Sequence, residues 1–290
     1  MPVRYRALEE ADVGEAAELF ITALCDMARR NGLPSPTAYN RAYVEPRYAQ
    51  LRRTGIFRVA EADGKIVSIC CALVRGEEWF LSMFWTLPEW QRQGVGGPLL
   101  RQVWQAGREQ GARLDFTWSS IDFAAIGSYL RLGMLPGCQI FTFAGAPLRV
   151  PGPAAGYTLE PLERATAAEL DASARGTARD LEHEFFSSSA GAAYQVRVGA
   201  ELAGYFYAGD GVIGPAAWTS PKHARPVLDL AVRAASEQAR DIKLMTLGLN
   251  HDALRAALEL ELKIVSAAHF LRSQPFGALE RYLPSGPVFF

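Results

Sequence analysis

One stretch decides the fold. It covers residues 84–103 and reads FWTLPEWQRQGVGGPLLRQV. Its aromatic first part predicts a strand that ends before Pro88. From Gly96 onward apolar residues recur at helical spacing, with Leu99 and Val103 on one face. Glycines therefore lie at the amino terminus of a helix, where backbone N–H groups lack helical partners and the helix dipole is positive. This arrangement predicts a binding site for a pyrophosphate group.

Two common phosphate-binding loops do not match this stretch. A P-loop ends in Gly-Lys-Ser/Thr, which is absent here, and the dinucleotide fingerprint needs a third glycine where the chain has Leu99. What remains is Gln-x-x-Gly-x-Gly, formed by Gln91, Gly94 and Gly96. A second pattern follows one predicted strand later. It reads DFAAIGSYLRLGM over residues 122–134.

The two patterns together resemble the GNAT (GCN5-related N-acetyltransferase) superfamily. Its acetyl-CoA motif is Gln/Arg-x-x-Gly-x-Gly/Ala after a strand, and its next helix often carries Asn-x-x-Ala-x-x-x-Tyr-x-x-x-Gly-Phe. Here Asp122 replaces the Asn and Met134 replaces the Phe, at identical spacing. The resemblance covers essentially all of residues 1–145. It implies an α/β fold with a mixed, mostly antiparallel twisted sheet, a central parallel pair of strands, and helices on both faces.

The hydrophobic pattern of the first half agrees with this order of elements. It predicts strands at 4–8, 57–62, 65–75, 79–86, 113–119 and 138–143. It predicts helices at 12–30, 38–53, 96–110 and 124–132.

The resemblance also implies a reaction and the residues that perform it. An amine attacks the thioester of acetyl-CoA directly in a ternary complex, and a strand N–H holds the oxyanion. Tyr129 would protonate the departing thiolate, although by itself it also fits a core tyrosine with a satisfied hydroxyl. Contacts to acetyl-CoA are expected from Trp85, Thr86, Leu87, Arg92, Gln93, Gly94, Val95, Gly96, Gly97 and Asp122. No metal is expected.

The general base and the acceptor pocket have weaker sequence signals. Glu77 and Glu78 precede the strand, but adjacent residues point opposite ways, and a charged turn explains them better. The family places acceptor contacts near residues 31–55, where aromatic and basic residues alternate, namely Tyr39, Arg41, Tyr43, Arg47, Tyr48, Arg52 and Arg53. These residues fit a pocket for an acidic or aromatic amine. They fit a solvated face with extended arginines equally well.

The chain repeats its pattern after the midpoint. Its 290 residues suit two domains, and the Pro- and Gly-rich segment 145–156 predicts a linker. The sequence WTLP at 85–88 recurs as WTSP at 218–221, and the helix start at Asp122 recurs at Asn250. Matches in the same order indicate duplication. We expect two tandem GNAT-like domains, an acetyltransferase domain at 1–146 and a degenerate one at 156–290, joined by a linker at 147–155.

The second copy lacks the residues on which the chemistry depends. It has no glycine in the stretch from Lys222 to Asp229, and Ala257 stands where the first copy has Tyr129. We expect this domain not to bind CoA productively. Its expected role is structural: it completes the sheet, forms one side of the acceptor pocket or forms a homodimer. His223 and His251 fall near its former site and are expected to be solvated loop histidines.

Composition and charge limit the remaining possibilities. With 49% hydrophobic and 21% charged residues the chain is an ordinary globular protein, and its net charge of -1 argues against a nucleic-acid or membrane binder. No leader or membrane span is apparent, so a cytoplasmic protein is expected. The four cysteines have no C-x-x-C spacing and predict buried free thiols; they are Cys25, Cys70, Cys71 and Cys138.

These observations predict an enzyme, an acetyl-CoA-dependent N-acetyltransferase whose acceptor is a primary amine of a small molecule. Three alternatives stay open. The chain would be a non-catalytic acyl-CoA sensor or scaffold, an acetyltransferase for a protein or peptide amine, or an enzyme that uses a longer acyl-CoA.

Overall fold

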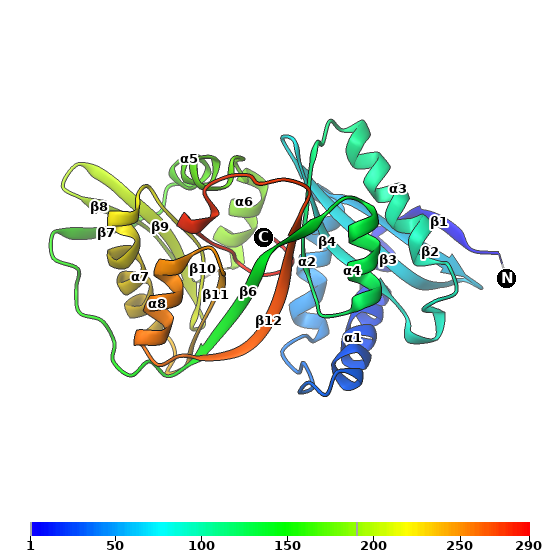
Figure 1. Ribbon diagram of the computed structural model, residues 1–290, viewed down its shortest axis with the longest axis horizontal. Helices are drawn as coiled ribbons and strands as arrows, with labels where there is room; N and C mark the ends of the chain where they lie inside the picture. Colours follow the sequence, from blue (N-terminus) through cyan, green and yellow to red (C-terminus); the bar gives the residue numbers. More distant parts are fainter. Residues whose placement is uncertain (1, 190) are drawn as a thin grey trace. The chain divides into compact units, whose positions relative to one another are not determined.

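The computed structural model describes residues 2–189 and 191–290, and the chain divides into two compact units. Unit 1 comprises the residues up to Thr117 together with Asp122–Met134. Unit 2 comprises Trp118–Ile121 and Leu135–Phe290. Figure 1 follows the chain from the blue elements of unit 1 to the orange and red elements of unit 2.

Unit 1 contains five strands in the order β1-β2-β3-β4-β5, and all pairs are antiparallel except β4 with β5. The strands are β1 (Arg4–Ala7), β2 (Ile56–Ala62), β3 (Lys65–Arg75), β4 (Glu78–Thr86) and β5 (Leu114–Ser119). The helices are α1 (Val13–Arg30), α2 (Arg41–Thr54), α3 (Gly96–Glu109) and α4 (Phe123–Arg131), with short 3-10 turns at Glu10–Asp12 and Pro88–Trp90. This is the expected mixed sheet with one parallel pair.

Helices cover both faces of the unit 1 sheet. The indole Nε1 of Trp79 on β4 donates a hydrogen bond to the Val103 carbonyl of α3 at 3.3 Å. On the other face, the hydroxyl of Tyr48 on α2 lies 3.5 Å from the sulfur of Met83. Strand β4 is therefore covered by α3 on one side and by α2 on the other, as a strand inside a layered α/β core requires.

Unit 2 repeats the order of elements found in unit 1. Its first strands are β6 (Leu135–Gly145), β7 (Tyr157–Pro161), β8 (Ala192–Val198), β9 (Glu201–Gly209) and β10 (Val212–Trp218). They are followed by β11 (Ile242–Leu247), β12 (Lys263–Arg272) and β13 (Tyr282–Leu283), with a 3-10 turn at Leu279–Arg281. The helices are α5 (Arg164–Arg175), α6 (Asp180–Ser189), α7 (Pro221–Ser236) and α8 (His251–Glu259). Strands β10 and β11 are parallel, as β4 and β5 are.

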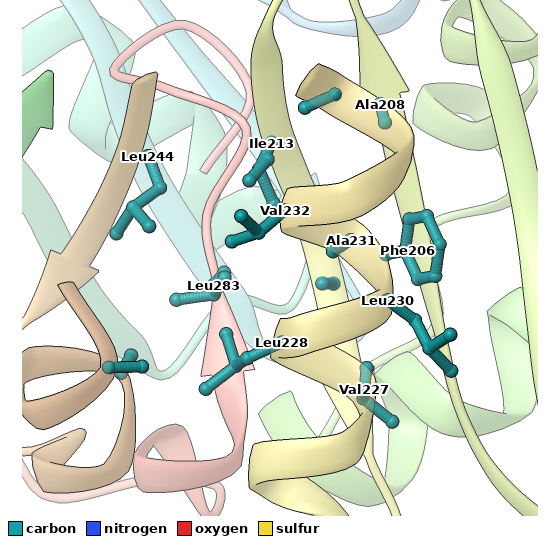
Figure 2. Close-up of a cluster of buried hydrophobic side chains, with 14 of the residues drawn as sticks. Phe206, Ala208, Ile213, Val227, Leu228, Leu230, Ala231, Val232, Leu244 and Leu283 are labelled. Carbon is teal, nitrogen blue, oxygen red and sulfur yellow. The ribbon is translucent and has the colours of Figure 1, made fainter. Parts of the chain in front are cut away.

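The core of unit 2 lies between α7 and the sheet. Figure 2 shows Leu228 and Val232 of α7 near Ile213 and Leu283 from the strands, and all belong to one buried cluster. The apolar stripe of α7 therefore faces the strands, which is why this helix forms although it contains Pro226.

Strand β6 has partners on both sides within unit 2. It pairs antiparallel with β11, for example Phe143 with Leu244, and with β12, for example Phe141 with Ala267. Figure 1 shows the green β6 beside the orange β12. In space this strand belongs to unit 2, although it comes before the Pro- and Gly-rich segment in the sequence.

The cysteines only partly follow the sequence prediction. All four are free, and Cys70 and Cys71 of β3 are fully buried. Cys25 is exposed, because it lies on the face of α1 opposite its buried residues, and Cys138 is half-buried. None of the helices in the described part of the chain combines the length and hydropathy of a membrane span.

Candidate active site

A β-bulge in β4 sets the direction of the side chains at the candidate site. Cys71 pairs with Met83 and Ala72 pairs with Leu81, so Ser82 is an extra residue on β4. A bulge of this kind shifts the alternation of side chains and bends the strand. Without it, Trp79 and Phe84 would lie on opposite faces of the sheet, since they are five residues apart.

The bulge brings Phe84 and Thr86 to the same face of the sheet as α3. Both side chains lie next to Gly96, within 3.4 Å of where a Cβ atom would stand. Trp85 points to the other face and contacts Phe20 of α1, with ring centroids 5.2 Å apart. The end of β4 thus presents one side to the glycine loop and the other to α1.

Strands β4 and β5 are paired only over the first half of β4. Their parallel register runs from Glu78 with Leu114 to Leu81 with Thr117, and the Thr117 hydroxyl donates to the Leu81 carbonyl at 2.9 Å. Strand β4 then continues to Thr86. The two strands therefore separate after Leu81, at the position of the bulge, and the backbone of β4 gains an edge that a ligand can approach.

The loop after β4 has the backbone of an anion site. Gly94 has φ +80°, Arg92 has φ +62°, and α3 starts at Gly96 without a side-chain cap. Among the described residues, none accepts a hydrogen bond from the amides of residues 93–97. An alanine at Gly96 would place its Cβ 2.9 Å from Phe84 Cζ. The close approach of α3 to β4 thus requires glycine at position 96. The amides of the loop remain available to bind an anion.

The other expected contact residues of this loop surround the glycines. Arg92, Gln93 and Gly97 are exposed, and Val95 is buried with its carbonyl accepting from the Tyr5 hydroxyl at 3.1 Å. The guanidinium of Arg101, one turn into α3, lies 3.8 Å from where a Gly97 Cβ would stand. Exposed amides next to an arginine suit the phosphate groups of CoA, so the residues present fit that ligand.

The end of β4 is held in place by polar contacts that the sequence alone did not reveal. The Leu87 amide donates to the Val67 carbonyl of β3 at 3.0 Å. The Ser68 hydroxyl lies 3.0 Å from the Trp85 carbonyl and 2.8 Å from the Thr86 hydroxyl. Because N–H groups alternate along a strand, the amides of Phe84 and Thr86 face the edge that opens after Leu81.

Asp122 and Tyr129 lie on α4, as the second motif predicts. Asp122 is the N-cap residue, and its Oδ1 accepts from the amides of Ala124 and Ala125 at 2.9 and 3.1 Å. Tyr129 is 6% exposed, and its ring lies 6.3 Å from that of Phe84. Burial raises the pKa of Tyr129 well above its ordinary value. No hydrogen bond to its hydroxyl comes from the described residues, so a protonated, unpaired phenol lies beside the strand that carries the open edge.

Glu77 and Glu78, the carboxylates considered as bases, lie away from this site. Glu77 lies in the turn before β4 and Glu78 is the first residue of the strand, so eight steps along the strand, about 26 Å, separate Glu78 from Thr86. Asp115 pairs with Arg108 near the same end. The expected charged turn holds only for Glu77, because Glu78 belongs to the strand and is buried at 5% exposure.

The aromatic residues expected near the acceptor divide into two groups. Tyr48 is buried in the core at 1% exposure. Tyr39 and Tyr43 instead extend the row of rings that starts at Trp85 and Phe20, with centroids 5.7 Å apart for Phe20 and Tyr39 and 5.5 Å for Tyr39 and Tyr43. Among the arginines, Arg41 pairs with Glu18 and Glu45, and Arg52 pairs with Glu10, which is typical of a solvated face.

The second copy has no comparable loop. Helix α7 starts at Pro221, which has no N–H, directly after Ser220. The prediction of a solvated His223 is wrong. The residue is 1% exposed, its Nδ1 lies 2.9 Å from the Tyr157 hydroxyl, and its Nε2 lies 3.0 Å from Glu201. Periodicity did not reveal that this position lies inside the first turn of α7, facing the sheet.

Comparisons with known proteins agree with this geometry. Residues 21–134 match the model of the acetyltransferase (GNAT) family. No curated protein sequence matches the chain. Among solved structures, a candidate acetyltransferase from Pyrococcus horikoshii superposes with a TM-score of 0.77 at 18% identity, covering 99% of this chain and 96% of that chain.

Two further structures extend over nearly the whole chain. A GCN5-related N-acetyltransferase from Sphaerobacter thermophilus gives a TM-score of 0.66 at 15% identity, covering 96% of this chain and 98% of that one. A tandem GNAT protein from the clavulanic acid biosynthesis pathway gives 0.62 at 14%, covering 94% and 99%. At these identities the likeness establishes the fold. Residues 21–134 thus match the GNAT acetyltransferase family, and the chain as a whole has the fold of a tandem GNAT protein.

Proposed function

We propose that this chain is an acetyl-CoA-dependent N-acetyltransferase that acts on a primary amine of a small molecule. The match to the GNAT family indicates acyl transfer from an acyl-CoA in general. The acetyl donor and the small amine are our more specific proposals. The observation that carries the acyl-transfer proposal is the glycine loop packed against Phe84, beside the buried side chain of Tyr129.

The residues of unit 1 divide the work of such a reaction. Bound acetyl-CoA supplies an activated thioester. The amides of residues 92–97 bind its pyrophosphate, and the amides of Phe84 and Thr86 bind polar groups along the open edge of β4. A tyrosine is protonated at neutral pH, and burial raises the pKa of Tyr129 further. Tyr129 would give its proton to the sulfur that leaves as the amine nitrogen bonds to the acyl carbon, and the proton that this nitrogen loses on becoming an amide would restore the phenol.

We assign one acyl-CoA site to each chain, in the acetyltransferase domain at 1–146. Three features of the domain at 156–290 support this assignment. Pro221 removes an amide from the start of α7, the buried side chain of His223 in its first turn bonds to Tyr157 and Glu201, and Ala257 replaces the tyrosine. The second domain then has a structural role, and the segment 147–155 links the two copies.

The test is a Tyr129→Phe variant measured with a panel of amines by release of free CoA thiol. Since the hydroxyl has no partner among the described residues, the variant should fold normally and bind acetyl-CoA as the parent does. Its kcat should fall by about 100-fold or more, which is the usual size of a general-acid contribution. Unchanged turnover would remove Tyr129 from the mechanism.

The same assay separates the alternatives. A sensor or scaffold binds acetyl-CoA but releases no thiol with any amine, whereas turnover only with peptide or protein amines would replace the small-molecule acceptor.

A further inference from the structure

Arg30, the last residue of α1, contacts its own helix and two other segments of unit 1 through one guanidinium. Its Nε donates to Asp26 of its own helix at 2.7 Å. Its Nη2 lies 3.4 Å from the Gln91 side-chain oxygen and 3.6 Å from Asp122 Oδ2. The contact with Gln91 is a long hydrogen bond, whereas the contact with Asp122 is an ion pair. The loop after β4 and the start of α4 thus share one cation.

The contact with Gln91 fixes the orientation of its amide. The Nε2 of Gln91 donates to the Thr86 carbonyl at 3.1 Å, and a carbonyl can only accept. The amide oxygen must therefore point the other way, toward Arg30. Through this one amide, Arg30 connects α1 to the last residue of β4.

The contact between Arg30 and Asp122 affects the charge of the site. One oxygen of this carboxylate caps α4 by accepting from two amides, and the other faces Arg30. A carboxylate beside a site for a pyrophosphate would repel the ligand, because like charges disfavour each other at short range. Arg30 supplies the opposite charge while Asp122 keeps its capping bonds.

We propose that Arg30 is a positioning residue of the acyl-CoA site, which neutralises Asp122 and fixes Gln91 so that the glycine loop and α4 are held ready for a polyanionic ligand. This inference rests on the proposed function. Its neighbour Arg29 provides a matched control. Arg29 also pairs with Asp26, at 2.7 Å, but its side chain is 75% exposed, and neither Gln91 nor Asp122 is its partner.

The experiment is a double-mutant cycle in the full-length protein, read by calorimetric titration with acetyl-CoA at low salt. It compares the parent with Arg30→Met, Asp122→Asn and the double variant, and uses Arg29→Met as the control. We expect Arg30→Met to raise Kd about two- to fivefold, the size of a partly exposed ion pair, and Arg29→Met to leave it unchanged. In the Asp122→Asn background the same Arg30→Met change should have a smaller effect, since no charge remains to be neutralised.

Equal effects of Arg29→Met and Arg30→Met, or additive effects in the cycle, would overturn the proposal. Hydrogen exchange of the unliganded protein provides a reading that does not depend on the ligand. Arg30→Met should speed exchange in the loop 88–95 and at the first turn of α4, and Arg29→Met should not. If the parent fails to bind acetyl-CoA, the proposed function is refuted, and the exchange data alone decide whether Arg30 anchors these segments.

Discussion

Replacement of Gly96 by alanine tests the link between the packing of α3 and ligand binding. The new Cβ would stand 2.9 Å from Phe84 Cζ, 3.2 Å from Phe84 Cε2 and 3.4 Å from the Thr86 hydroxyl oxygen. Carbon atoms pack best about 3.5–4.0 Å apart, so the start of α3 must move away from β4 by roughly 0.6 Å or Phe84 must rotate. The Tyr129 ring also lies next to Phe84, with ring centroids 6.3 Å apart, so a rotation of Phe84 would disturb this contact. Strain of this kind costs about 1–3 kcal/mol.

The melting temperature and the Kd for acetyl-CoA both report on this strain. We expect Gly96→Ala to lower the melting temperature by about 2–4 °C per kcal/mol and to raise the Kd for acetyl-CoA about tenfold, because the loop amides are displaced. Gly97→Ala gives the comparison, since only Arg101 lies within 4 Å of its new Cβ. Its melting temperature should match that of the parent, and any loss of affinity then measures how closely the ligand approaches. A Gly96→Ala protein with parental melting temperature and Kd would refute the reasoning.

Three further predictions follow from other parts of the two units. Gly107→Ala should destabilise unit 1 by about 1–3 kcal/mol in denaturant unfolding, because its Cβ would clash with the Trp79 ring. Asp171→Asn should destabilise unit 2 by about 3–5 kcal/mol in the same assay, because it leaves Arg179 buried without its ion-pair partner. Burial alone would raise the pKa of Asp171, but the charge of Arg179 and the hydrogen bond from His183 outweigh it and lower the pKa. The resulting stability is complete above the unfolded pKa of about 3.9 and is lost as pH falls below it, so melting curves from pH 7 to pH 3 should show unit 2 weakening only at the acidic end.

The sequence predicted the regular elements well where hydrophobic periodicity was strong. Strand β3 was expected at 65–75 and has those bounds, and α3 was expected to start at Gly96 and does. The two motifs also indicated which residues lie at the start of α3 and α4. These features depend on local patterns of glycine, caps and apolar spacing, which a single sequence contains.

Features set by contacts between distant segments could not be predicted in this way. The extra residue Ser82 looks like any other strand residue in the sequence, yet it turns Phe84 and Thr86 toward the glycine loop. The contacts of Arg30 with Gln91 and Asp122 join positions far apart along the chain. The pairing of β6 with β11 and β12 likewise follows from sheet register and leaves no local signal.

A crystal structure of the chain with CoA bound tests the central claim most directly. The account predicts density for the pyrophosphate beside the amides of residues 92–97, with the sulfur near the Tyr129 hydroxyl, and no CoA at the start of α7 near Pro221. CoA bound at the start of α7, or a pyrophosphate away from residues 92–97, would contradict it.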